Sequence, residues 1–107
     1  MKLLEFKDKL QKGCNLGGEV VYIKEENLLY GIKSIYINNE DSSITILKSK
    51  EESIKTKDFI KILNEIPQEE NISINIGQQE YVRSEIKKIK NIEFAQYNSI
   101  KMIFINV

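Results

Sequence analysis

Adjacent acidic residues come closest to a catalytic pattern in this sequence. They occur as Glu25-Glu26, Glu40-Asp41, Glu51-Glu52 and Glu69-Glu70. Acid–base catalysis needs two carboxyl groups in a shielded cleft, where their pKa values can separate. All four pairs stand in polar connections beside Asn, Ser, Lys or Gln, so we expect solvated loops and no catalytic dyad.

Other chemically active side chains are few. The chain has one cysteine, Cys14, and no histidine, which excludes histidine-dependent triads and multi-thiolate metal sites. Cys14 follows a predicted helix, whose negative C-terminal end disfavours a thiolate. Residues 38–41 offer oxygen ligands for a hard cation but lack the residue order of a calcium loop. We therefore expect no enzyme activity, no metal and no cofactor.

One basic cluster stands out, because the chain as a whole carries sixteen basic and sixteen acidic residues and a net charge of zero. The cluster comprises Arg83, Lys87, Lys88 and Lys90, with Tyr81 nearby. Three roles stay open for it: a solvated sheet edge kept soluble by lysines, a contact with a protein, or a contact with a nucleic-acid backbone.

Two tyrosines are candidates for an outward surface. In strands whose apolar neighbours point inward, Tyr22 lies opposite Val21 and Ile23, and Tyr36 takes the same position in the next strand. Tyrosine is favoured in binding hot spots. The alternative is that both rings cover the second face of the sheet beneath the rest of the protein. We take Tyr22, Tyr36, Tyr81, Arg83, Lys87, Lys88 and Lys90 as candidate partner-binding residues.

The first half of the chain predicts one helix followed by three strands. Leu3, Phe6 and Leu10 follow helical spacing over 3–12, and Gly13 is expected to end that helix. The Gly17-Gly18 pair precedes a strand, so we expect a turn there and no phosphate loop. Strands are predicted over 19–23, 28–37 and 44–47, with a polar turn at 38–43.

The same order of elements recurs after a polar linker at 48–55. Thr56 is expected to cap a second helix over 57–64, which ends before Pro67. A strand follows over 72–76 and another over 100–103. Between them, residues 81–94 fit either a helical turn or a strand from about 86 to 94, and we favour the strand.

An internal repeat organises these elements. Phe59 and Leu63 stand 53 residues after Phe6 and Leu10. One αβββ unit has too few strands to cover its helix, so two units are expected to share a core. We predict an α+β fold in a single domain, 1–107. Its two tandem αβββ units, about 1–48 and 56–107, would pack two helices on one or two antiparallel sheets.

The unit resembles small proteins of phages and other mobile elements. Its matching parts are a short helix, a strand opening with an acid and Val-Val, isoleucine-rich strands and an Asn/Asp turn; here these are Phe6 to Leu10, Glu19 to Ile23, Ile32 to Ile37 and Ile44 to Leu47. The resemblance carries no active site to transfer. It implies a binding protein, for example an anti-CRISPR-type inhibitor that blocks a bacterial defence effector sterically.

We therefore expect a non-catalytic, protein-binding module. The alternatives are an immunity or antitoxin-like protein that neutralises one toxin, and a nucleic-acid-binding accessory protein. The first residues contain no apolar signal segment, and the apolar runs are too short to cross a membrane, so we expect a cytoplasmic protein with no membrane partner.

Overall fold

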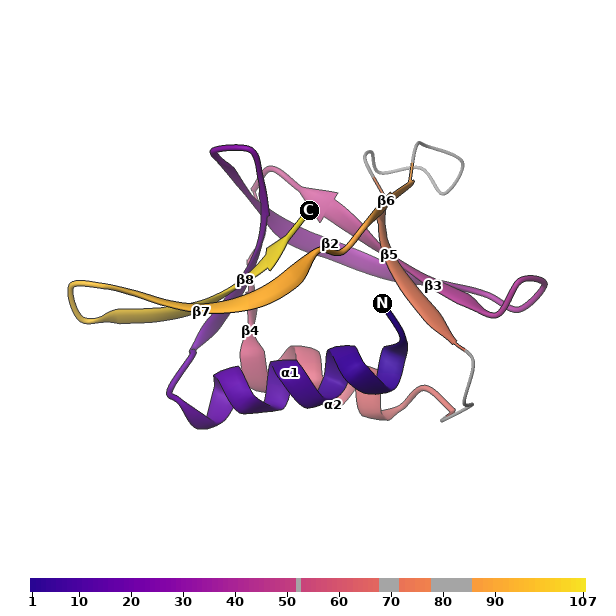
Figure 1. Ribbon diagram of the computed structural model, residues 1–107, viewed down its shortest axis with the longest axis horizontal. Helices are drawn as coiled ribbons and strands as arrows, with labels where there is room; N and C mark the ends of the chain where they lie inside the picture. Colours follow the sequence, from indigo (N-terminus) through magenta and orange to yellow (C-terminus); the bar gives the residue numbers. More distant parts are fainter. Residues whose placement is uncertain (52, 68–71, 78–85) are drawn as a thin grey trace.

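Two helices lie on one side of a strongly curved sheet (Figure 1). The computed structural model describes residues 1–51, 53–67, 72–77 and 86–107. The elements are α1 (Leu3–Asn15), β1 (Val20–Glu25), β2 (Leu28–Asn38), β3 (Ser43–Ser49), β4 (Ile54–Lys55), α2 (Thr56–Asn64), β5 (Ser73–Gly77), β6 (Ile86–Lys88), β7 (Asn91–Tyr97) and β8 (Ile100–Asn106). The predicted α+β class is confirmed.

The eight strands form one mixed sheet in the order β6-β5-β3-β2-β1-β8-β7, and β4 pairs with β1 beside this path. The prediction of purely antiparallel pairing is wrong at two places, because β1 pairs with β8 and β3 pairs with β5 in parallel. Helix α2 connects β3 to β5, and a crossover of this kind returns the chain in the same direction.

The chain passes directly from one end of the strand order to the other. β6 and β7 occupy the two ends, yet only residues 89 and 90 separate them. Ile89 is buried in the core, and the Lys90 amide donates a hydrogen bond to the Asn106 carbonyl at 2.8 Å. The strand predicted over 86–94 is therefore present, but it is interrupted at this joint, which bends the sheet around the core (Figure 1).

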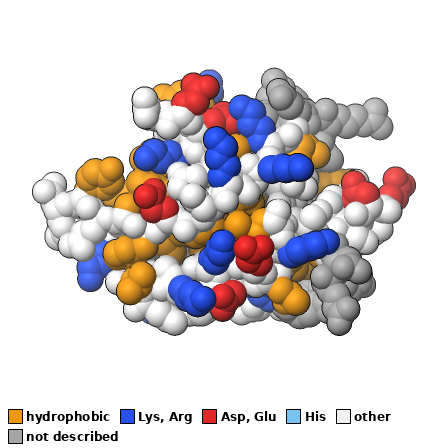
Figure 2. Space-filling model, viewed as in Figure 1, with side chains coloured by type: hydrophobic (Ala, Val, Ile, Leu, Met, Phe, Trp, Pro, Cys, Tyr) orange, Lys and Arg blue, Asp and Glu red, His pale blue; other side chains and the backbone are white. Residues whose placement is uncertain are grey.

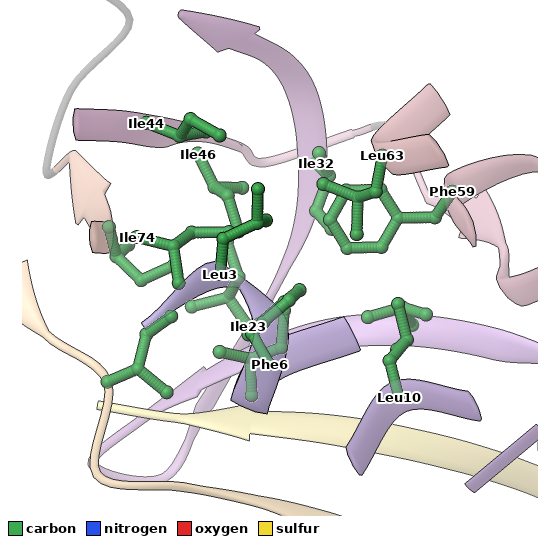
Figure 3. Packing of buried hydrophobic residues seen from close by; sticks show 14 of the residues in the cluster. Leu3, Phe6, Leu10, Ile23, Ile32, Ile44, Ile46, Phe59, Leu63 and Ile74 are labelled. Carbon is green, nitrogen blue, oxygen red and sulfur yellow. The ribbon is translucent and has the colours of Figure 1, made fainter. Parts of the chain in front are cut away.

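One hydrophobic core fills the space between the helices and the sheet. Phe6 from α1 and Phe59 from α2 are both fully buried, and their rings meet edge to face with centroids 6.0 Å apart. Leu3 and Leu10 point from α1 toward the same core (Figure 3). The sheet contributes the inward side chains Val21, Ile23, Ile32, Ile44, Ile46, Ile74, Ile76, Ile103 and Ile105.

Helix α1 continues past the residue that was expected to end it. Gly13 lies within the last turn of the helix. A larger residue would not fit there, because an added Cβ would stand 2.8 Å from Ile103 Cδ1. The chain turns at Gly17 instead, whose φ of 102° is the left-handed conformation that glycine adopts readily. The Gly18 amide then donates to the Gly13 carbonyl and the Gly17 amide to the Cys14 carbonyl, which is a Schellman cap.

We expect Gly18→Ala to destabilise the fold by about 2 kcal/mol, because the new methyl group would overpack the core. An added Cβ at Gly18 would lie 2.6 Å from Ile103 Cγ1 and 3.0 Å from the Gly13 carbonyl oxygen. Urea denaturation measures the effect, and Leu16→Ala at the neighbouring exposed position serves as the control. A loss below about 0.5 kcal/mol would show that Ile103 can move aside.

The start of α2 differs from the prediction. Lys55 precedes the helix, and Thr56 is its first residue, so Thr56 is not the N-cap. The Thr56 side chain faces the core, and its hydroxyl has no hydrogen-bond partner in the part of the chain that the structure describes. The predicted linker is also partly structured, because β3 extends to Ser49 and Lys55 pairs with Val20 through β4.

The outer side of α1 is charged. Lys9 pairs with Glu5 at 3.2 Å and Lys12 with Asp8 at 3.0 Å, one helical turn apart. Figure 2 shows basic and acidic side chains alternating along this lower part of the molecule. Neither of the two helices described has the length and apolar character that crossing a membrane requires.

Candidate functional site

The strands β1 and β8 carry apolar side chains on the side of the sheet that faces away from the helices. Val21, Ile23 and Ile103 point to the core, so their neighbours in the strands point outward. The parallel register places Val20 beside Met102 and Tyr22 beside Phe104. We call the surface formed by these four outward side chains the β1–β8 face.

Apolar side chains also surround this centre. Ala95 pairs with Met102, Tyr97 with Ile100, and Leu29 with Lys24, so all of them share the outward side. Tyr97 is 60% exposed and Ile100 is 54% exposed. Such exposure of large apolar residues, next to a buried aromatic centre, is typical of a surface that contacts another molecule.

Two hollows open along the β1–β8 face. One, of about 360 Å³, is lined by Lys24, Asn27, Leu29, Tyr97, Met102 and Phe104. The other, of about 740 Å³, lies at the beginning of β1 and is lined by Val20 and Tyr22 together with Cys14, Gly17, Gly18, Glu19, Ser53, Lys55 and Lys57. Each hollow therefore combines an apolar floor with lysines at its margin.

Charged side chains lie at the margin of the apolar centre of the face. The Lys24 ammonium lies 5.2 Å from the centre of the Phe104 ring, so its stem covers part of that ring. Lys55 stands beside Val20 in the next strand, and Glu93 stands beside Phe104. Phe104 and Met102 are only 3% and 8% exposed, so the apolar surface open to solvent on this side comes from the exposed Tyr97 and Ile100 and from the half-buried Val20 and Tyr22.

The second parallel pair of strands carries mostly polar residues on its outward side. In β3 and β5, Ser43 lies beside Ser73 and Thr45 beside Asn75 on the outward side. Their neighbours Ile44 and Ile74 are fully buried, as Val21 and Ile103 are in the other pair. Leu47, beside Gly77, is the one apolar outward residue of the pair. Polar residues thus serve at positions where the β1–β8 face carries Tyr22 and Phe104.

The structure separates the tyrosines that the sequence analysis singled out. Tyr22 is half-buried at the centre of the β1–β8 face, opposite the core residues as expected. Tyr36 is exposed in β2 and lies beside Thr45, on the outward side of the other half. Tyr81 lies outside the described residues. The two described tyrosines therefore belong to different surfaces.

The predicted basic cluster does not form one patch among the residues that the structure describes. Lys87 faces the core side of the sheet beside Ile76, and its ammonium lies 3.0 Å from Glu25. Lys88 alternates to the opposite face, and Lys90 is exposed in the joint between β6 and β7. Arg83 lies outside the described residues.

Glu25 links three strands through two ion pairs. Its carboxylate lies 3.1 Å from the Lys48 ammonium and 3.0 Å from that of Lys87, while its side chain is only 15% exposed. The Lys48 ammonium also lies 4.2 Å from the centre of the Tyr30 ring. Burial by itself raises the pKa of Glu25, but the hydrogen bonds and positive charges of Lys87 and Lys48 outweigh it, so the pKa lies below its usual value.

The placement of Glu25 corrects a prediction. We expected this residue in a solvated connection, but it belongs to β1. The signal was the alternation itself, because Val21, Ile23 and Glu25 follow one another on the same side of the strand. Extending the strand by one more alternation would have placed the carboxylate next to the core.

The remaining chemical candidates have local roles. Glu40 and Asp41 are exposed, as expected for a solvated turn. The Asn38 side chain accepts a hydrogen bond from the Glu40 amide at 3.0 Å, and the Ser43 hydroxyl donates to Asp41. Cys14 is a half-buried free cysteine in the last turn of α1. Within the described ranges, no three acidic or cysteine side chains gather as a metal site would need.

Comparison with known proteins gives no match: neither a protein-family model, nor a curated protein, nor a solved structure resembles this chain significantly.

Proposed function

We propose that this protein acts by binding another protein through the β1–β8 face. The observation that carries the proposal is the contrast between the two parallel strand pairs. One pair places Ser, Thr and Asn on the outward side, with Leu47 as its one apolar residue, and the other places Val20, Tyr22, Met102 and Phe104 there. This difference between the two pairs supports a role in contact for the apolar set.

The composition of the face favours a protein as the partner. Specific protein interfaces combine a centre rich in aromatic residues with a polar rim, and the accessible Tyr22 and Tyr97 with Lys24 and Glu93 fit that description. A nucleic-acid surface would instead need a continuous group of lysines, whereas Lys24, Lys55 and Lys57 lie only at the margins of an apolar centre.

In its more specific form, we propose a non-catalytic inhibitor that blocks a bacterial defence effector sterically, as an anti-CRISPR protein does. The support is the resemblance of the helix-and-strand unit to small phage and mobile-element proteins. We also propose that the chain consists of two related αβββ units. The support is that the first strand after each helix pairs in parallel with the last strand of the other half.

We expect Tyr22→Lys to weaken binding to the partner by about 30-fold or more, because a central aromatic anchor contributes about 2 kcal/mol. The protein is used as bait in a lysate of bacteria that carry defence nucleases, and retained proteins are identified by mass spectrometry. Each candidate is then purified and its affinity measured by calorimetry. The same variant should lose its ability to relieve target interference in cells.

Tyr36→Lys is the matched control, since it places the same charge at an outward tyrosine of the other half. It should bind and inhibit like the wild type, and both variants should unfold at wild-type urea concentrations. Equal affinity of the Tyr22→Lys and wild-type proteins for a confirmed partner would refute the β1–β8 face as the binding surface. If the purified partner is not an effector, or interference is unaffected, the inhibitor role fails while the binding role stands.

A further inference from the structure

The strand β7 presents a long open edge. β7 ends the strand order and pairs with β8 along all seven residues of Asn91–Tyr97, with no irregularity in the register. Among the described residues, no other strand pairs with its second side. Its outer backbone N–H and C=O groups are therefore available to a further strand.

Within the described residues, two other open edges of the sheet are protected against such pairing. β2 meets β1 only through residues 28–30, and the exposed part beyond them carries a bulge between Ile32 and Ser34, with Lys33 at that point. β6 has three residues, of which Lys87 and Lys88 are charged. Bulges, short edges and lysines are the devices by which sheets avoid unwanted strands.

β7 has none of these devices. Its sequence, Asn-Ile-Glu-Phe-Ala-Gln-Tyr, contains no lysine, no proline and one charge, Glu93. Ile92, Phe94 and Tyr97 favour the strand conformation. Figure 2 shows hydrophobic side chains at the left of the view, where Figure 1 places the tip of the β7–β8 hairpin. This edge is thus suited to being paired.

We propose that β7 pairs antiparallel with β7 of a second copy of this chain. A two-fold axis at Phe94 is the arrangement that pairs all seven residues, because it places Asn91 opposite Tyr97 of the other copy. In this register Glu93 faces Ala95, so the one charge of the strand does not lie directly opposite itself. The two Phe94 rings meet across the axis, and cross-strand aromatic pairs of this kind stabilise a sheet.

The pairing joins the two sheets into one continuous sheet. It places the β1–β8 faces of both copies on the same side, because antiparallel neighbours share their outward direction. The contact is small, so we expect a weak dimer with a dissociation constant of about 10 to 100 µM. This inference concerns the edge of the sheet and does not depend on the partner proposed above.

Sedimentation velocity of the wild-type protein from about 5 to about 500 µM tests the proposal, and a concentration-dependent shift from monomer to dimer is expected. Ala95→Glu should weaken the dimer by about 10-fold or more, because each new carboxylate faces Glu93 of the other copy. Adding Glu93→Lys to Ala95→Glu should restore dimerisation, since the facing charges are then opposite.

Ser34→Glu is the control, because it adds the same charge at an exposed strand position away from β7. It should dimerise like the wild type, and circular dichroism should show that every variant is folded. A wild-type protein that stays monomeric at about 500 µM would overturn the proposal. A dimer that resists Ala95→Glu, or that the charge exchange fails to restore, would overturn it as well.

Discussion

Glu25→Gln is expected to lower the free energy of unfolding at pH 7 by about 3 kcal/mol. Glutamine keeps the shape of the side chain but removes the negative charge that faces two ammonium groups. The Lys48 side chain is only 8% exposed, so its charge depends on nearby compensation. Breaking a buried ion pair by removing one partner costs much more than losing an exposed pair.

The effect should depend on pH in a defined direction. Because the pKa of Glu25 is lowered in the folded state, the carboxylate contributes its full stability above its unfolded pKa. That contribution is lost as the pH falls below the unfolded pKa of glutamate, about 4.3, and through the lower folded pKa. The difference in unfolding free energy between wild type and Glu25→Gln should therefore narrow between pH 7 and about pH 3.

Urea denaturation at these pH values measures both effects. Glu26→Gln is the matched control, since Glu26 is the adjacent carboxylate but is exposed in the turn between β1 and β2. It should change the stability by less than about 0.5 kcal/mol. An equally small loss for Glu25→Gln, with no dependence on pH, would mean that the two ion pairs contribute nothing to folding.

Phe6→Ala should cost about 4 kcal/mol, because it removes a fully buried ring and leaves a cavity where the two helices meet the sheet. The same ring makes the edge-to-face contact with Phe59, so a double-mutant cycle with Phe59→Ala should give a coupling energy of about 1 kcal/mol. Thermal and urea denaturation give these values.

Leu4→Ala provides the comparison on the same helix, since Leu4 is 48% exposed. It should cost less than about 1 kcal/mol. If Phe6→Ala and Leu4→Ala destabilised the protein equally, the helix would not be held by its inward face. Additive costs for Phe6→Ala and Phe59→Ala would contradict the contact between the two rings.

Local patterns in the sequence were sufficient to predict the two helices and most of the strands. The spacing of Leu3, Phe6 and Leu10 predicted the buried side of α1, and alternation around Tyr22 predicted an outward side chain in β1. Both patterns come from short stretches in which burial repeats with the period of the element. The predicted helix ends were less accurate, because Gly13 and Thr56 lie within the helices and pack against the core, and neither is the cap residue that was expected.

The pairing of distant strands was beyond these patterns. Val20 and Met102 lie side by side, yet nothing near either residue indicates the other. The apolar character of the β1–β8 face became visible only when the parallel register placed Tyr22 beside Phe104. Lys87 was predicted to be part of a basic surface because its partner Glu25 lies far away in the chain, and the sequence near Lys87 does not indicate this ion pair.

The parallel contact between β1 and β8 also has a consequence for how the protein folds. Val20 is synthesised well before its neighbour Met102, so this part of the sheet has a high contact order and should form slowly. Until residues 100–106 arrive, the side of β1 that later receives β8 remains unpaired, and Val21 and Ile23 lack Ile103 and Ile105. Unpaired strand edges and exposed apolar side chains of this kind make a partly folded chain prone to aggregation.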